Sequence, residues 1–121
     1  MNEINSPLTI TLGDTPQNKV LSFLFSHHDF DYSKSDLAKM TNLSRQTIYT
    51  ALKPLLRFDL VIVTRRIANT TLYTLNMNSK PIKALLSYNK AIIKDEHRFD
   101  NDKKKIRKIL EKRKDMLIAL S

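Results

Sequence analysis

A short polar run between Arg45 and Lys53 holds the side chains that are best suited to recognise a ligand. Arg45 can donate two hydrogen bonds to a guanine edge, and Gln46 can pair with an adenine edge. The other polar members, which suit bases or phosphates, are Ser44, Thr47, Tyr49, Thr50 and Lys53. Apolar residues lie between them at helical spacing. The sequence predicts a helix that buries one face and offers the other to a groove of DNA, with an ordinary solvated helix face as the alternative.

Two short helices joined by a tight turn are expected to position these side chains. Residues 35–56 read SDLAKMTNLSRQTIYTALKPLL, with apolar positions where two crossed helices would pack. Asn42 tolerates the left-handed backbone of such a turn, and Ser44 can cap the second helix, expected over residues 44–57. Pro54 lies inside that helix, but the apolar stripe continues beyond it. We therefore expect a kinked helix rather than one that stops there.

A β-hairpin is expected next. Residues 60–67 are rich in β-branched side chains, residues 72–75 form a second short strand, and residues 68–71 link the two. The arm at residues 64–71 would carry polar side chains to a flanking minor groove or to phosphates, namely Arg65, Arg66, Asn69 and Thr70. The alternative is that these four are solvated residues of the hairpin.

The N-terminal part combines a predicted strand with a predicted helix. Leu8, Ile10 and Leu12 alternate with threonines, which is a strand pattern, and residues 1–14 would form an N-terminal strand or arm. Thr15 and Pro16 are a typical helix start, and the helix would run to about residue 26. Residues 30–32 would be extended, and Ser33 or Ser35 would cap the next helix. Residues 15–78 would then form one domain.

Residues 79–121 are expected to form two helices. The first begins near Pro81, and the cluster at residues 100–102 predicts a break before the second. Seven-residue spacing of the apolar side chains suits pairing with a second copy of the chain. The expected dimerisation residues are Leu85, Ile92, Ile106, Ile109, Leu110, Met116, Leu117 and Leu120. Two alternatives remain: the last helix packs on its own domain, or it binds nucleic acid through Lys103, Lys104, Lys105, Arg107 and Lys108.

Composition narrows the function classes further. The chain has 121 residues and a net charge of +9, which indicates a polyanionic partner. With no cysteine and one glycine, it offers neither a thiolate metal site nor a glycine-rich phosphate loop. His27, His28 and His97 lack zinc-ligand spacing, and no nucleophile has an evident base. We expect a cytoplasmic protein that is not an enzyme and has no cofactor, metal or membrane partner.

The order of elements, with a helix, a short strand, a helix, a turn, a helix and a hairpin, resembles the winged helix-turn-helix family over residues 16–75. The motif SDLAKMTNLSRQTIYTALKPLL carries the resemblance, and TRRIANTTLYTL stands where the wing would be. The following sequence, LYTLNMNSKPIKALLSYNKAII, is similar to small archaeal transcription regulators of the MarR and ArsR-like type. The resemblance implies an α+β, mainly α fold with a two-stranded wing and C-terminal dimerisation helices.

The resemblance also implies a homodimeric transcription regulator that binds double-stranded DNA sequence-specifically, with residues 44–57 in the major groove and residues 64–71 as the wing. Two alternatives stay open at this point. One is an architectural or plasmid-partition DNA-binding protein, and the other is a winged-helix protein-interaction module of the transcription machinery. The sequence leaves a small-molecule effector unspecified.

Overall fold

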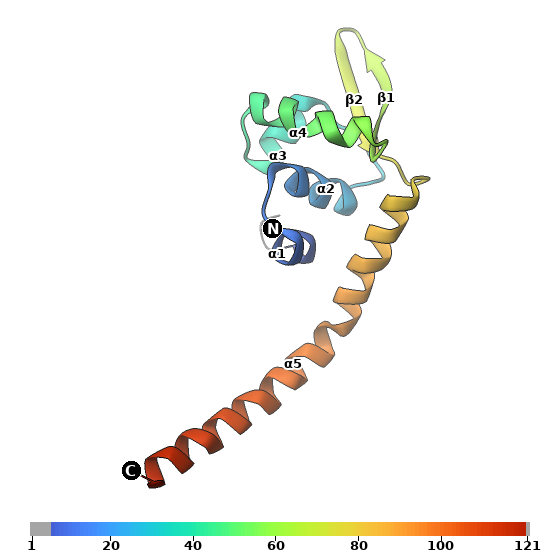
Figure 1. Ribbon diagram of the computed structural model, residues 1–121. Coiled ribbons are helices and arrows are strands. Elements are labelled where there is room, and N and C mark those ends of the chain that lie inside the picture. Colours follow the sequence, from blue (N-terminus) through green and yellow to red (C-terminus); the bar gives the residue numbers. More distant parts are fainter. Residues whose placement is uncertain (1–5, 121) are drawn as a thin grey trace. The chain divides into compact units, whose positions relative to one another are not determined.

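The computed structural model describes the backbone of residues 6–120 and the side chains of residues 6–94 and 104–114. Over these residues five helices and one two-stranded sheet follow in the order α1, α2, α3, α4, β1, β2, α5 (Figure 1). The chain divides after Asn89 into two units, and residues of α5 contribute to both. The prediction of a mainly helical α+β fold is confirmed.

The predicted N-terminal strand is wrong, because Pro7–Leu12 form a helix, α1. Ser6 caps this helix by accepting a hydrogen bond from the Thr9 backbone at 3.3 Å, and Pro7 occupies its first position. Leu8 is buried whereas Ile10 is 67% exposed, so the two side chains do not share a face as a strand would require. The Ser–Pro start signal outweighs the alternation of apolar residues.

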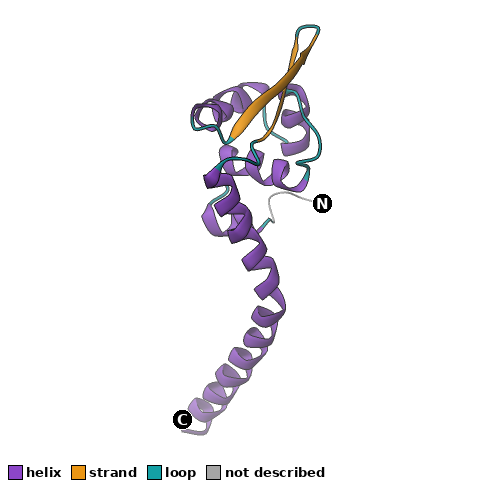
Figure 2. Cartoon of the chain, turned by 90° about the vertical axis from the view of Figure 1, so that its right-hand side faces the viewer, coloured by secondary structure: helices purple, strands orange, loops and turns teal. Residues whose placement is uncertain are grey.

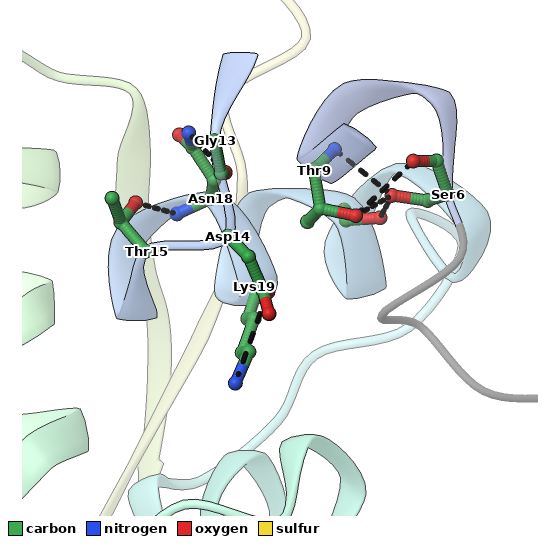
Figure 3. A network of polar contacts seen from close by, with 8 residues as sticks. Ser6, Thr9, Gly13, Asp14, Thr15, Asn18 and Lys19 are labelled. Carbon is green, nitrogen blue, oxygen red and sulfur yellow. Dashed lines mark hydrogen bonds and ion pairs between the residues drawn. The ribbon is translucent and has the colours of Figure 1, made fainter. Parts of the chain in front are cut away.

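A small polar network attaches α1 to helix α2, which spans Pro16–Ser26 (Figure 3). The Ser22 hydroxyl donates to the Ser6 hydroxyl at 2.5 Å, and the Ser6 hydroxyl lies 3.0 Å from that of Thr9. All three residues are buried. The Asn18 side-chain amide donates to the Gly13 carbonyl at 2.9 Å. Gly13 has a φ of 112°, which side chains disfavour. Buried hydroxyls that satisfy one another therefore fix α1 on the domain.

Three helices build the core that positions the polar run. Helix α2 buries Phe23 and Leu24, helix α3 (Lys34–Thr41) buries Leu37, and helix α4 (Arg45–Arg57) buries Ile48 and Leu52. These side chains belong to one apolar cluster, each of them at most 1% exposed. Apolar burial of this kind contributes about 25 cal/mol per Å² of surface removed from water. The predicted packing of crossed helices is confirmed.

The caps of α3 and α4 follow the sequence signals. Ser33 and Asp36 form a reciprocal capping box at the start of α3, which settles the choice between Ser33 and Ser35. Asn42 ends α3 in the left-handed conformation, with a φ of 57°, and Ser44 caps α4. Helix α4 continues through Pro54 to Arg57, as its apolar stripe predicts. The turn between the two helices is therefore encoded locally.

The hairpin consists of β1 (Val61–Ile67) and β2 (Thr70–Leu75), paired antiparallel, and its tip projects beyond the helices of its unit (Figures 1 and 2). Its link is shorter than predicted, because only Ala68 and Asn69 connect the strands. Ala68 takes a φ of 54°, which allows this two-residue turn without glycine. The predicted extended segment is confirmed at Tyr32, which pairs with Tyr73 through two backbone hydrogen bonds of 2.8 Å.

Helix α5 runs without interruption from Lys80 to Leu120, so the predicted break at residues 100–102 is wrong. Asp and Asn can cap a helix but do not impose an end, and no glycine or proline follows Pro81. Ser79 caps the start, with the Ile82 backbone donating to its hydroxyl at 3.4 Å, and Ile82 is fully buried. No helix among the described residues is long and apolar enough to cross a membrane.

Candidate nucleic-acid interface

The polar side chains at the start of α4 are displayed to solvent. Arg45 and Gln46 are exposed in the first turn of the helix, and among the described residues neither makes a side-chain hydrogen bond. Because α4 buries Ile48 and Leu52 on its other side, the core fixes the direction in which Arg45 and Gln46 point. Both groups therefore keep their donors available for an external ligand.

The neighbouring hydroxyls are partly occupied within the helix. Ser44 accepts from the Thr47 backbone at 3.1 Å and lies 2.8 Å from the Thr47 hydroxyl, and Thr47 is half-buried. Thr50 donates its hydroxyl to the Gln46 carbonyl at 3.1 Å. Ser44 thus acts as the cap. Thr50, which is exposed, retains an acceptor oxygen and a methyl group for an outside partner.

Two ammonium groups lie close to the ring of Tyr49. Its ring centroid is 4.5 Å from Lys34 Nζ and 4.7 Å from Lys53 Nζ, and its ring is about half exposed. Sequence reasoning selected Tyr49 and Lys53 but missed Lys34, the first residue of α3. No local signal marks Lys34, because its relation to Tyr49 arises only when α3 and α4 pack.

On the hairpin, Arg65 is not available in the way the sequence predicted. Its Nε donates to Asp31 Oδ2 at 2.9 Å and its Nη2 donates to Asp31 Oδ1 at 3.2 Å, while Thr64 donates to the same carboxylate at 2.6 Å. These bonds hold the pKa of Asp31 below its ordinary value and raise the pKa of Arg65. Within the described residues Arg66 forms no salt bridge, and Arg66, Asn69 and Thr70 are exposed.

The contact between Asp31 and Arg65 gives a testable effect on the hairpin. We expect Asp31→Asn to accelerate amide exchange of β1 and β2 a few-fold at pH 7, because the bidentate pair joins the segment before α3 to the hairpin. A lowered folded-state pKa means that the contribution is complete above the ordinary pKa of 3.8 and is lost as pH falls through the lower folded value.

Amide exchange followed by mass spectrometry from pH 7 downward checks this expectation. The difference between Asp31→Asn and wild type should therefore shrink as the pH falls through the lowered pKa of Asp31. Asp29→Asn is the matched control, since the Asp29 side chain is 83% exposed and touches only His28 among the described ion pairs. Equal exchange in both variants at pH 7 would show that the pair does not hold the hairpin.

A polar groove joins the start of α4 to the hairpin. Its volume is about 330 Å³, and its lining residues are Ser33, Lys34, Ser35, Arg45, Asn69, Thr70, Thr71 and Tyr73. The fold thus brings together Arg45, Asn69 and Thr70, which the sequence had assigned to separate elements. A smaller groove of about 210 Å³ places Gln17 of α2 beside Gln46 and Thr50. Gln17 is a second residue that sequence reasoning missed.

The predicted dimerisation residues lie along α5. Leu85 is half-buried against the core of its own unit, and Ile92 is half-buried. Ile106, Ile109 and Leu110 are 55%, 55% and 56% exposed. The side chains of Met116, Leu117 and Leu120 lie outside the described residues, as does that of Lys103. The dimerisation role of all eight stays a prediction.

Two of the three histidines have local partners. His27 stacks on Phe23 with ring centroids 4.4 Å apart, and its Nδ1 lies 2.9 Å from the Phe23 carbonyl. His28 Nδ1 lies 3.1 Å from the Phe25 carbonyl. Both rings therefore contribute to the end of α2. The side chain of His97 lies outside the described residues.

Solved structures share this arrangement of elements. MepR, a transcription regulator of the Staphylococcus aureus multidrug efflux pump MepA, aligns with a TM-score of 0.55 at 18% identity over 80% of this chain and 77% of MepR. The S. aureus MepR–DNA complex gives 0.55 at 17% over 80% and 82%. A mutant of Lactococcus lactis ZitR in its apo form gives 0.54 at 16% over 81% and 80%. The fold is a winged helix.

Sequence comparison adds nothing to this result, since no protein-family model and no curated protein matches the chain. The structural neighbours are winged-helix transcription regulators of the MarR family. They come from Staphylococcus aureus and Lactococcus lactis, so the archaeal part of the predicted resemblance has no support. By position in the winged-helix fold, α4 occupies the place of the recognition helix, and β1 and β2 occupy that of the wing.

Proposed function

We propose that this protein is a transcription regulator that binds double-stranded DNA sequence-specifically as a homodimer. The observation that carries the proposal is the exposed pair Arg45 and Gln46 in the first turn of a helix whose other face is buried in the core. The winged-helix fold, shared with a protein solved in complex with DNA, supports the same partner.

The start of α4 is the part that enters the major groove in this proposal. Side chains at the N-terminal end of a recognition helix reach base edges, so Arg45 would pair with guanine and Gln46 with adenine. Lys53 lies two turns further along, with its Nζ 4.7 Å from the Tyr49 ring centroid, and would contact the backbone. Arg66, Asn69 and Thr70 on the wing would reach the flanking minor groove or phosphates, whereas Arg65 would serve mainly to brace the wing through Asp31.

Selection of binding sites from random duplex DNA tests the proposal most directly. We expect a short consensus to emerge that the full chain binds at least about a thousandfold more tightly than unrelated duplex at physiological salt. Binding without sequence preference that grows cooperatively along any duplex would instead indicate an architectural protein. Absence of binding to every duplex at low salt would leave a protein-interaction module.

The homodimer part of the proposal rests on α5. Ile106, Ile109 and Leu110 form an exposed apolar stripe over residues 104–114, whose other faces carry mostly charged side chains. Ile109 and Leu110 follow Ile106 by three and four residues, which places all three side chains on one face of the helix, as in a coiled-coil seam. A second copy of the chain would bury this stripe.

Shortening α5 should therefore abolish the dimer. We expect a chain ending at Arg98 to sediment as a monomer where the full chain sediments as a dimer. In the full chain, Ile109→Gln should weaken dimerisation about tenfold or more, because an isoleucine buried in each copy contributes about 1.5–3 kcal/mol. Lys108→Gln is the control, since Lys108 lies away from the stripe on the same helix. A dimer that survives truncation would refute the seam.

A further inference from the structure

Lys34 is a charged residue at the start of α3 that lies close to two aromatic rings. It is half-buried at the first position of α3, outside both the recognition helix and the wing. Its Nζ lies 4.5 Å from the Tyr49 ring centroid and 5.9 Å from that of Tyr73. Two aromatic rings from α4 and β2 therefore hold one ammonium group at the polar groove.

The groove presents positive charge and hydrogen-bond donors together. Lys34 and Arg45 supply its two cations, and Ser35, Asn69 and Thr70 supply uncharged polar groups. Among the described residues neither cation takes part in a salt bridge, so both charges are available to a ligand. Because hydrogen bonds from charged donors to anions are stronger than those to neutral groups, this set of side chains favours an anionic ligand over a neutral one.

The nearest acidic side chain on α3 is directed elsewhere. The Asp36 carboxylate accepts from the Ser33 backbone at 3.1 Å as part of the capping box, and Asp36 lines a different groove with Phe30 and Lys39. No carboxylate lines the groove that Lys34 shares with Arg45 in this part of the structure. The groove is therefore positively charged, and no acidic side chain of its lining neutralises Lys34 or Arg45.

We propose that this groove binds the phosphate backbone of one DNA strand, with Lys34 as the cation that holds it and Tyr49 as the positioning residue that fixes Lys34. The inference rests on the proposed DNA-binding function. It adds a DNA contact at the groove between the recognition helix and the wing, made by Lys34 of α3, which belongs to neither. It also assigns the aromatic ring of Tyr49, rather than its hydroxyl, as the group that matters.

The salt dependence of DNA affinity for Lys34→Gln tests the site. Each lost phosphate contact lowers the slope of log affinity against log salt by about 0.9, so we expect that reduction together with a roughly fivefold to tenfold weaker affinity for every sequence. Lys39→Gln makes the same change of charge on the exposed side of α3, beside Phe30 and Met40. It should leave the slope as in wild type.

A pair of substitutions at Tyr49 tests the positioning role. Tyr49→Phe keeps the ring and should retain the wild-type slope and affinity, whereas Tyr49→Leu should reduce the slope as Lys34→Gln does. Thermal unfolding of each variant controls for folding, since Tyr49 is 47% exposed. Loss of affinity in Tyr49→Phe would assign the role to the hydroxyl and overturn this part of the proposal.

Duplexes that carry one neutral methylphosphonate linkage at a time locate the contact. One linkage should weaken binding of wild type and of Lys39→Gln but not of Lys34→Gln. If wild type binds DNA while Lys34→Gln and Lys39→Gln have equal slopes, the groove does not bind phosphate. If wild type binds no duplex at low salt, the proposed function itself fails, so the two failures are distinguishable.

Discussion

Replacing Phe23 with alanine is expected to lower the free energy of unfolding by about 3–5 kcal/mol. Phe23 is fully buried in α2 and stacks on His27 at 4.4 Å, while its ring meets that of Tyr32 edge-on at 4.9 Å. Alanine would leave a cavity at the point where α2 supports both the segment before α3 and the core under α4. A loss of this size is a large part of the stability of a small domain.

Urea unfolding followed by far-ultraviolet circular dichroism measures this effect. Phe30→Ala is the matched control, because the Phe30 side chain is 68% exposed and should change stability by no more than about 0.5 kcal/mol. Phe23→Leu keeps most of the buried volume and should lie between the two, which keeps the test informative if Phe23→Ala fails to fold. Equal midpoints for Phe23→Ala and Phe30→Ala would show that the core is not built around Phe23.

The parts of the fold that the sequence predicts are those with local signals. Thr15 with Pro16 starts α2, and Ser44 starts α4, in each case through a side chain that accepts from a backbone amide three residues later. Asn42 makes the sharp turn because its left-handed conformation costs it little. Such signals depend on only a few neighbouring residues, and the structure contains the caps and the turn that they predict.

The errors arise where a local pattern supports two structures. Alternation over residues 8–12 is a strand signal, yet the cap at Ser6 and its bond to Ser22 make the same residues a helix. The residues at 100–102 could cap a new helix, yet α5 continues through them. In both places, the outcome depends on which signal the rest of the chain supports.

The candidate site shows the same limit more sharply. The side chains of α4 were predictable because they are simply the polar face of an amphipathic helix. The bond between Asp31 and Arg65, which are 34 residues apart, was not predictable, and neither was the placement of Lys34 against Tyr49 and Tyr73. Contacts between distant parts of the chain depend on packing, which a single sequence does not display as a pattern.

Arg45→Ala should separate base recognition from general attraction to DNA. We expect it to weaken binding to the best site by about 1–3 kcal/mol, or roughly 5-fold to 150-fold, and to relax the base preference at one position. The reason is that alanine has no donor to replace the two hydrogen bonds from Arg45 to guanine. Because Arg45 is exposed, its removal should change the stability of the fold little. Affinities for the selected site and for its single-base variants give both quantities.

Lys53→Ala is the control for this measurement, because it also removes one positive charge from α4. Lys53 lies two turns along α4 beside the Tyr49 ring, so its removal should weaken all sequences alike and lower the salt slope by about one. Base discrimination that changes in Arg45→Ala but not in Lys53→Ala would place the start of α4 at the base edges. If Arg45→Ala discriminated among bases as wild type does, the polar face of α4 would be a solvated surface, and recognition would have to come from another part of the domain.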